Sequence, residues 1–235
     1  MRRWTALARI GLLLAGLVWA QGKGDEQLQK CARVLNEILD IPDGIPRNIL
    51  DRAQCVAVFP DVSIHGFESG AASVRGAMTC RSGANFSGPW GAPAMYSLQT
   101  GDVELKFIGR AADFVLLIMN AEMAKTALRS NVVLRGNLAR GEHTAAPGPM
   151  VKDWQVTADR TIPAEILTYR RSRGIFGGVS LEGCVLRAQD ESNATVYGRR
   201  LTAWQIVREN AVATTPAGAA MTGVLNEKSP RNLLK

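Results

Sequence analysis

The spacing that comes nearest to a catalytic motif surrounds Ser180, in the run Gly178-Val179-Ser180-Leu181-Glu182. A nucleophilic serine in a G-x-S-x-G pattern sits on a sharp turn from strand to helix, where the last glycine relieves steric crowding. This chain has Glu182 in the place of that glycine, and its apolar pattern continues as a strand. The motif therefore gives only weak support to a hydrolase that uses Ser180.

The histidines and carboxylates form no catalytic or metal-binding pattern. Neither His65 nor His143 belongs to an H-E-x-x-H motif, and the sequence contains no G-x-x-x-x-G-K-[ST] or G-x-G-x-x-G phosphate loop. Asp113 opens an apolar run, which favours a structural hydrogen-bonding role, and Glu182 has no partner at a useful spacing. The sequence predicts no catalytic residue, no metal and no cofactor.

Four cysteines, Cys31, Cys55, Cys80 and Cys184, are far apart along the chain. They form no C-x-x-C pair and have no neighbouring histidine, which argues against a zinc or redox site. Three of them lie in apolar strand-like runs, where a free cysteine behaves as a small hydrophobic residue. Four cysteines allow three pairings that the sequence cannot distinguish. Disulfides and buried thiols therefore both stay open.

The N-terminus has the three parts of a secretory signal peptide. Arg2, Arg3 and Arg9 supply a basic start, the apolar run Ile10–Trp19 follows, and Val18-Trp19-Ala20 fits a cleavage site. The apolar run is shorter than the roughly 20 residues that span a bilayer, although an uncleaved anchor is an alternative. We expect residues 1–20 to be removed and the remainder to reach an oxidising compartment.

The net charge then becomes modest. The chain has 28 Lys and Arg against 21 Asp and Glu, a formal charge of +7, and losing the three arginines of residues 1–20 leaves +4. A nucleic-acid-binding domain usually carries a stronger and clustered excess, so we expect no nucleic-acid partner. With 46% hydrophobic and 21% charged residues, the composition is that of a globular domain.

The elements that must position these residues follow from apolar periodicity. Period-3.6 patterns predict helices at Asp25–Asp40, Arg47–Ala53, Ala121–Arg129 (capped by Asn120) and Ala203–Asn210 (capped by Thr202). Period-two runs predict strands at Cys55–Phe59, Ala77–Arg81, Ala94–Leu98, Val103–Gly109, Asp113–Met119, Ala164–Tyr169, Ile175–Leu181 and Cys184–Ala188.

Most connections between these strands are too short for helical crossovers, which favours antiparallel pairing. The predicted class is therefore α+β: a multistranded antiparallel sheet, sandwich- or barrel-like, with helices at its ends or on one face. One domain over residues 25–210 follows the signal peptide. Ala211–Lys235 is rich in Ala, Thr, Gly and Pro, and it is expected to be a flexible tail.

Three features could bind a surface. The helix Asp25–Asp40 has an apolar face that includes Leu35 and a weakly basic polar face with Lys30 and Arg33, so it faces either the core or a membrane interface. The second feature is the arginine block Arg170, Arg171 and Arg173, which is either a solvated turn or an anionic-surface contact. The third is the loop Phe86–Trp90, whose Trp90 is more typical of a core residue.

The same residues carry a family resemblance. The most specific block is Tyr169-Arg170-Arg171-Ser172-Arg173-Gly174-Ile175-Phe176-Gly177-Gly178-Val179-Ser180-Leu181-Glu182-Gly183. Shorter pieces precede or follow it in order, at Ala53–Pro60, Arg75–Arg81, Trp90–Ala94, Leu116–Asn120, Gly148-Pro149 and Tyr197-Gly198. Over about Asp25–Asn210, this pattern resembles the SYLF domain family.

The resemblance implies a lipid-binding module. Animal members bind phosphoinositides with help from an amphipathic N-terminal segment, fungal members also bind actin, and exported bacterial members are described as lipid-binding. The segment Asp25–Asp40 matches the amphipathic position. An exported protein meets no actin and few phosphoinositides, so those specificities are not carried over.

We therefore expect a non-enzymatic protein of the bacterial periplasm or cell envelope. Its expected partners are anionic membrane lipids with phospholipid or phosphoinositide-like headgroups, and its alternative role is a protein-binding scaffold. The expected lipid-binding residues are Lys30, Arg33, Leu35, Arg170, Arg171 and Arg173.

Overall fold

The computed structural model describes residues 4–42, 44–62, 73–99, 111–134, 138–140, 165–172, 175–178, 181 and 183–232. Of residues 4–21, 73, 138–140 and 175–178 it describes the backbone alone. Several predictions from the sequence fall outside the described residues: the strand Val103–Gly109 and the side chains of His65, His143, Arg173, Ser180 and Glu182.

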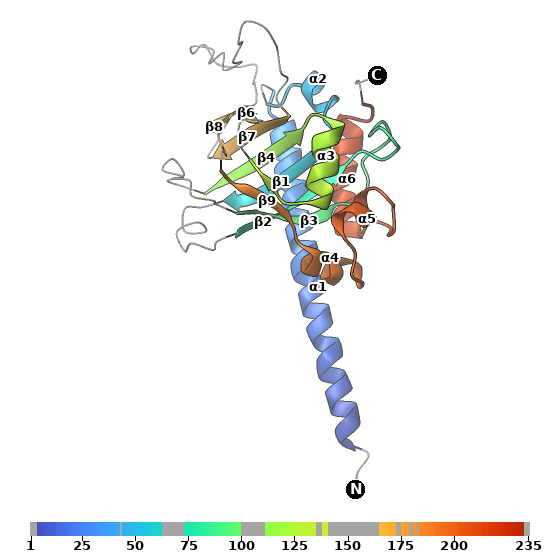
Figure 1. Ribbon diagram of the computed structural model, residues 1–235. Helices are drawn as coiled ribbons and strands as arrows, with labels where there is room; N and C mark the ends of the chain where they lie inside the picture. Colours follow the sequence, from blue (N-terminus) through green and yellow to red (C-terminus); the bar gives the residue numbers. More distant parts are fainter. Residues whose placement is uncertain are drawn as a thin grey trace, which may run out of the picture.

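In the described part of the chain, one nine-stranded sheet organises the fold (Figure 1). Its strands are β1 (Cys55–Val62), β2 (Ser73–Cys80), β3 (Ala94–Gln99), β4 (Ala112–Ile118), β5 (Val132–Val133), β6 (Leu138–Arg140), β7 (Ile166–Ser172), β8 (Ile175–Gly178) and β9 (Val185–Ala188). The strand order is β5-β9-β3-β2-β1-β4-β7-β6, and β8 also pairs with β7. All pairs are antiparallel except β6 with β7. The predicted α+β class is confirmed, with one parallel pair added.

The sheet is curled into a half-barrel, and the chain itself requires the curl. β5 and β6 end the strand order on opposite sides, and a flat sheet of eight strands would hold them about 34 Å apart. Val133 and Leu138 are five residues apart in sequence, and an extended chain spans at most about 18 Å over that length. The two edges must therefore approach each other.

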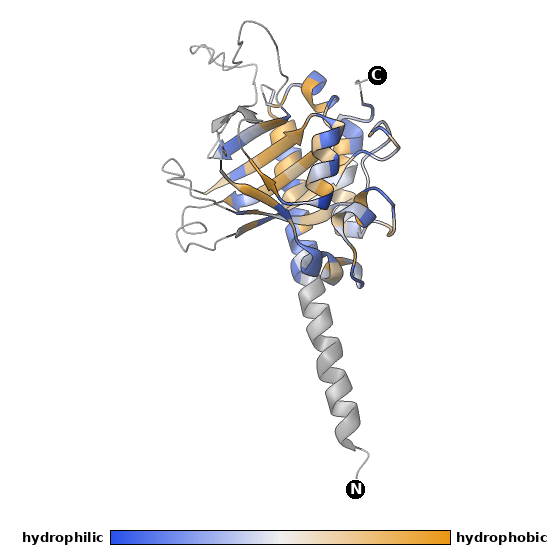
Figure 2. Ribbon diagram, viewed as in Figure 1, coloured by the Kyte–Doolittle hydropathy of each residue, from blue (hydrophilic) through white to orange (hydrophobic). Residues whose placement is uncertain are grey.

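Helices cover both faces of the sheet. They are α1 (Trp4–Leu39), α2 (Arg47–Leu50), α3 (Ala121–Arg129), α4 (Asp190–Tyr197), α5 (Ala203–Val207) and α6 (Pro216–Lys228). Alternate residues of β1 point to opposite faces of the sheet. Val56 and Val58 pack with α1 and α6, whereas Ala57 and Phe59 pack with α3 and α5. Figure 2 shows the hydrophobic strands lying between these helical layers.

The amphipathic helix predicted at Asp25–Asp40 is the C-terminal part of α1, which begins at Trp4. Its apolar side chains Leu28, Cys31, Leu35 and Ile38 are fully buried against the sheet and α6. The core interpretation is therefore confirmed, and an interfacial helix with this face in a membrane is wrong for the described fold. Across the described residues, no helix has an apolar stretch long enough to cross a bilayer.

The prediction that Ala211–Lys235 is a loose tail is wrong, because this segment contains α6. Thr215 caps the helix by accepting a hydrogen bond from the backbone N–H of Gly218, and Pro216 occupies its first turn. Met221 and Leu225 are fully buried in the cluster that contains α1. Tertiary packing on α1 stabilises a helix whose own sequence has a weak helical signal.

The predicted caps of two other helices are confirmed. The side chain of Asn120 accepts a hydrogen bond from Met123 N at 2.7 Å at the start of α3. Thr202 forms a reciprocal capping box with Gln205 at the start of α5. That helix ends at Val207, and the sequence did not predict α4.

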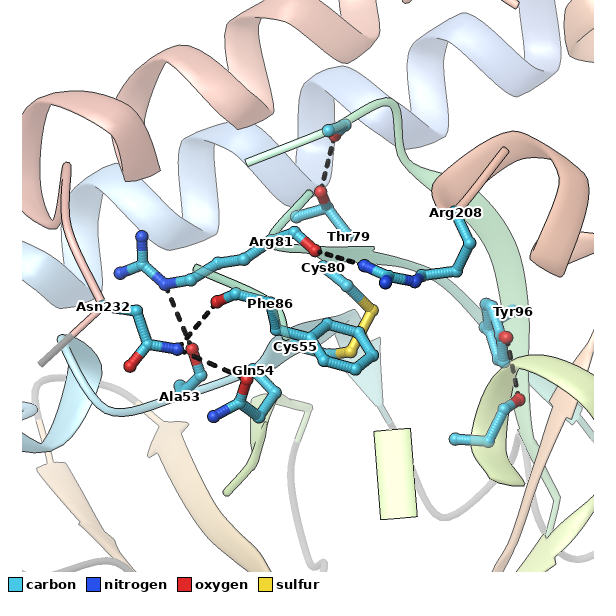
Figure 3. Close-up of a disulfide and its surroundings, with 12 residues drawn as sticks. Ala53, Gln54, Cys55, Thr79, Cys80, Arg81, Phe86, Tyr96, Arg208 and Asn232 are labelled. Carbon is cyan, nitrogen blue, oxygen red and sulfur yellow. Dashed lines mark hydrogen bonds between the residues drawn. A yellow bond between two sulfur atoms is a disulfide. The ribbon is translucent and has the colours of Figure 1, made fainter. Parts of the chain in front are cut away.

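The open question of the cysteines is resolved by the register of β1 and β2. Cys55 and Cys80 lie directly opposite one another and form a disulfide, shown in Figure 3. Cys31 and Cys184 are free and buried. Burial raises the pKa of the Cys31 thiol to about 12 and that of Cys184 to about 11, so both thiols are protonated and unreactive at neutral pH.

The C-terminal segment after α6 is held beside this disulfide. The fully buried Arg81 donates from Nη2 to the carbonyl of Ser229 at 3.0 Å and from Nε to the carbonyl of Ala53 at 3.2 Å. Asn232 donates to the carbonyl of Phe86 at 2.8 Å. Burial lowers the pKa of Arg81 to about 10. The end of the chain is thus an integral part of the domain.

Candidate functional site

Two groups of charged residues lie along α1. Within the part of the chain that the structure describes, no group of three His, Cys, Asp or Glu side chains is arranged to hold a metal. Asp113, the carboxylate singled out in the sequence, accepts a hydrogen bond from the backbone N–H of Asp61 at 3.1 Å. Its role in positioning the backbone agrees with the structural interpretation of that residue.

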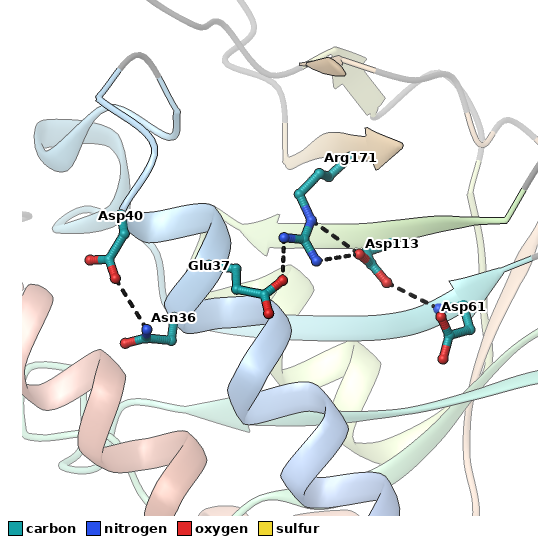
Figure 4. Close-up of polar contacts among 6 residues, drawn as sticks. All are labelled: Asn36, Glu37, Asp40, Asp61, Asp113 and Arg171. Carbon is teal, nitrogen blue, oxygen red and sulfur yellow. Dashed lines mark hydrogen bonds and ion pairs between the residues drawn. The ribbon is translucent and has the colours of Figure 1, made fainter. Parts of the chain in front are cut away.

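The first group centres on Arg171, as Figure 4 shows. Arg171 donates to one oxygen of Asp113 from Nε at 3.1 Å and from Nη2 at 2.7 Å. Its Nη1 donates to Glu37 of α1. Burial lowers the pKa of the Arg171 guanidinium, but the hydrogen bonds to Asp113 and Glu37 outweigh it and raise that pKa above its usual value. Arg171 is therefore engaged with the protein's own carboxylates.

The arginine block of the sequence is divided by the pleat of β7. Arg171 lies on the side of the sheet that α1 covers. Arg170 lies on the other side, paired with Phe114 of β4, which packs with α3 and α5. Arg170 is only partly exposed, and Arg173 is outside the described residues. The described residues therefore do not combine Arg170 and Arg171 into one basic surface.

A cleft of about 430 Å³ opens beside Arg171, at the C-terminal end of α1. Among the described residues, its charged lining consists of Arg171 and the carboxylates of Glu37, Asp61 and Asp113. Three carboxylates against one guanidinium make the described lining formally negative by two charges. This cleft does not suit an anion alone.

The second group is a set of exposed cations, which we call the basic face: Lys23, Lys30 and Arg33 of α1, Arg75 of β2 and Arg187 of β9. Gln27 of α1 donates to the backbone carbonyl of Arg75 at 2.8 Å, which brings the helix and the strand together. Four of the five residues are exposed, and Lys30 is partly exposed.

Register places the two strand residues of the basic face on one side of the sheet. Arg75 pairs with Ser97, and Ser97 pairs with Arg187. Directly paired residues share a face, and Arg75 has the parity of Ala77, which packs in the cluster beneath α1. Two strand spacings separate Arg75 from Arg187 by about 10 Å.

The basic face is largely free of neutralising carboxylates. Among the described residues, Lys30 alone has an ion-pair partner there, Glu26 at 2.9 Å. The hydrogen bond and the charge of Lys30 hold the pKa of Glu26 below its usual value, and the charges of Arg33 and Lys23 act in the same direction. These cations are thus close enough to act on one carboxylate together.

The structure therefore separates the residues expected to bind lipid. Lys30 and Arg33 lie on the basic face, whereas Leu35 is fully buried and cannot contact a ligand in this fold. The sequence prediction missed Arg75 and Arg187. Arg75 stands two residues before the strand predicted at Ala77–Arg81, so extending the period-two pattern would have placed it on a sheet face.

Comparisons with known proteins identify the family of this chain. A family model described as Ysc84, "Las17-binding protein actin regulator", matches residues 100–228. The human SH3 domain-containing YSC84-like protein 1 is 29% identical over 191 residues, covering 77% of this chain and 52% of the relative. The Xenopus laevis protein of the same name is 31% identical over 181 residues, covering 73% and 50%.

A yeast relative extends the match. LAS seventeen-binding protein 3 of Saccharomyces cerevisiae is 23% identical over 211 residues, covering 86% of this chain and 44% of the relative. The chain thus spans about half the length of the curated relatives it matches. The family model covers more than half of the chain, and the chain belongs to the Ysc84 family, the family of the SYLF domain.

Proposed function

We propose that this protein is a non-enzymatic module that binds anionic phospholipid headgroups at a bacterial cell envelope. The observation that carries the proposal is the basic face, where Lys23, Arg33, Arg75 and Arg187 are exposed and have no carboxylate partner among the described residues. Each basic residue near an anionic membrane surface contributes about 1 kcal/mol. Four such residues strengthen binding by about 4 kcal/mol, or roughly a thousandfold.

Export to the periplasm or envelope is part of the proposal. The predicted signal peptide at residues 1–20 supports it, and so does the Cys55–Cys80 disulfide, because disulfides persist in oxidising compartments. The SYLF resemblance supports lipid as the ligand. In this proposal the binding residues are Lys30 and Arg33 from the sequence prediction together with Lys23, Arg75 and Arg187, while Leu35 holds α1 on the sheet.

Co-sedimentation with vesicles tests the lipid proposal. The protein is mixed with vesicles of phosphatidylglycerol and phosphatidylcholine, and with vesicles of phosphatidylcholine alone. We expect binding to the anionic vesicles that weakens as salt rises. Substituting Lys23, Arg33 and Arg75 by Ala together should weaken it by about a hundredfold.

A matched control removes the same charge elsewhere. Arg47 and Arg52 follow the C-terminal end of α1, Arg231 neighbours Asn232, which contacts Gln54, and all three arginines are exposed. Their combined replacement by Ala should weaken binding by less than about threefold. Absence of the unmodified protein from both pellets at low salt would sink the proposal. Equal losses in the two triple variants would show that net charge, rather than the basic face, determines binding.

A protein-binding scaffold is the second candidate. The names of the yeast relative and of the family model describe Las17-binding proteins, which favours a protein partner for some members. A pull-down in which one protein stays bound in stoichiometric amount after detergent has removed lipid would support this candidate. Loss of that protein in the Lys23, Arg33 and Arg75 variant would place the interaction on the basic face.

A further inference from the structure

The cleft at the C-terminal end of α1 has unused hydrogen-bonding groups of both charges. A guanidinium has five N–H groups, and Arg171 uses three of them on Asp113 and Glu37. Two N–H groups of Arg171 therefore have no acceptor among the described residues. The carboxylate of Asp61 has no side-chain partner among the described residues, and Glu37 uses only one of its oxygens in the hydrogen bonds described above.

The remaining groups suit a ligand that carries both charges. In the described lining, an anion such as phosphate meets one guanidinium but three carboxylates, and these four side chains together repel it. An ammonium group gains from the negative charge of the lining and can donate to the carboxylate of Asp61, which has no side-chain partner among the described residues. A ligand with an ammonium and a phosphate on a short linker satisfies the carboxylates and the free N–H groups of Arg171 together.

The size and walls of the cleft fit such a ligand. Its volume of about 430 Å³ lies within the 300–1,000 Å³ of small-molecule sites. Ile41, Ala111 and Ala112 supply an apolar part of the lining beside the charged groups. Two methylene groups between the ammonium and the phosphate would lie against this part.

We propose that the cleft binds a small zwitterion with a primary ammonium and a phosphate, such as the phosphoethanolamine headgroup. A trimethylammonium has no N–H to donate, so a choline headgroup binds less well. The site is distinct from the basic face and goes beyond the function proposed above. Seven residues of α1 separate Lys30 from Glu37, about 10 Å along the helix, so both sites can face one membrane.

Binding of soluble O-phosphoethanolamine to the purified, exported protein tests the site, by NMR titration or calorimetry. Phosphocholine and inorganic phosphate are the comparison ligands, and we expect each to bind at least about tenfold more weakly. Asp61→Asn should weaken phosphoethanolamine binding about tenfold. Asp61 has a positive φ of 55°, a conformation in which Asn is among the best tolerated residues, so this variant is expected to fold.

Glu209→Gln serves as the matched control, because Glu209 is exposed and lies outside the lining of the cleft. It should leave phosphoethanolamine binding unchanged. Equal affinities for phosphoethanolamine and phosphocholine would overturn the proposal. So would no measurable binding to the folded protein, or an Asp61→Asn variant that binds as well as the original.

Vesicles then distinguish a lipid source from a soluble one. At a fixed phosphatidylglycerol fraction, replacing phosphatidylcholine by phosphatidylethanolamine should increase binding, and Asp61→Asn should abolish the increase. If only the soluble zwitterion binds, the binding site is supported and its ligand is a free metabolite rather than a lipid headgroup. The triple variant of the basic face should retain phosphoethanolamine binding, so failure of one site is separable from failure of the other.

Discussion

Arg171 of β7 and Asp113 of β4 lie directly opposite one another in the sheet, and both hydrogen bonds between their side chains end on the same oxygen of Asp113. The other oxygen of Asp113 accepts from the backbone of Asp61. One carboxylate thus connects β7 to the end of β1. The ion pair is mostly removed from solvent, with side-chain exposures of 21% for Arg171 and 14% for Asp113.

Asp113→Asn should therefore lower the free energy of unfolding by about 1–3 kcal/mol, because a charged and mostly buried hydrogen-bond acceptor is replaced by a neutral amide. Urea denaturation at pH 7 measures the change. Glu37→Gln is the control, since Glu37 is 54% exposed and exposed ion pairs contribute about 0–1 kcal/mol. If Glu37→Gln destabilises the protein as much as Asp113→Asn, the partner in the sheet has no special role.

Leu35→Ala and Arg33→Ala should separate stability from binding. Leu35 lies on the face of α1 that packs on the sheet and is fully buried. Its truncation should therefore lower the free energy of unfolding by about 2–5 kcal/mol. Binding of the folded variant to anionic vesicles should not change. Arg33→Ala should weaken binding by roughly fivefold and leave stability nearly unaltered. Reduced vesicle binding by folded Leu35→Ala would instead support an apolar lipid contact by this helix.

Removing the Cys55–Cys80 disulfide should destabilise the protein by about 3.5 kcal/mol, which is the loop-closure entropy for a sequence separation of 25 residues. Thermal unfolding with and without reductant measures the effect, and the Cys55→Ala, Cys80→Ala double variant should be insensitive to reductant. Thiol titration of the denatured, unreduced protein should find two thiols, Cys31 and Cys184. Four titratable thiols would contradict the disulfide.

Stability should fall at alkaline pH because of the two buried thiols. Burial raises the pKa of Cys31 to about 12 and that of Cys184 to about 11, from a usual value near 9. Above pH 9 the folded state therefore binds more protons than the unfolded state, and stability decreases as pH rises. Each thiol should account for a loss of about 1.4 kcal/mol between pH 8 and pH 10.

The Cys31→Ala, Cys184→Ala variant checks this pH dependence. It should be less stable at every pH, because both sites leave cavities, but its decline from pH 8 to pH 10 should be about 2.7 kcal/mol smaller. Burial also raises the pKa values of Tyr96 and Tyr197 and lowers that of Arg81 to about 10, so their effects begin near or above pH 10. Parallel pH curves for the two proteins would exclude a contribution from the thiols.

Local signals in the sequence predicted much of the fold. The helix at Ala121–Arg129 and its cap at Asn120 follow from short-range hydrogen bonding and periodicity, and both are confirmed. By contrast, α6 contains two glycines and small residues, so its local propensity is weak. Its stability comes from contact with α1, whose residues lie nearly 200 positions earlier in the chain. Local patterns carry no information about that contact.

For the candidate sites too, local patterns predicted single elements but not the contacts between distant elements. Period-two patterning placed Asp113 on a strand but ended the strand before Arg171 at Tyr169, whereas β7 continues to Ser172. The pairing of Asp113 with Arg171 depends on the register of β4 with β7, which spans 58 residues of sequence. The run of arginines suggested one basic surface, whereas the pleat of the strand directs neighbours to opposite faces. Lys30 and Arg33 were identified from the helix alone. Arg75 joins them only because α1 crosses the sheet beside β2.

The packing of α1 on α6 also sets when the protein can fold. Leu35 and Leu225 belong to the same core cluster but leave the ribosome 190 residues apart, which corresponds to about 10–40 s of bacterial or eukaryotic synthesis at 5–20 residues per second. Until α6 emerges, the apolar face of α1 lacks its cover and Arg81 lacks its partner at Ser229. The core cluster that joins α1 to α6 is therefore completed only after α6 has been synthesised, so the first helix of the fold waits for the last one.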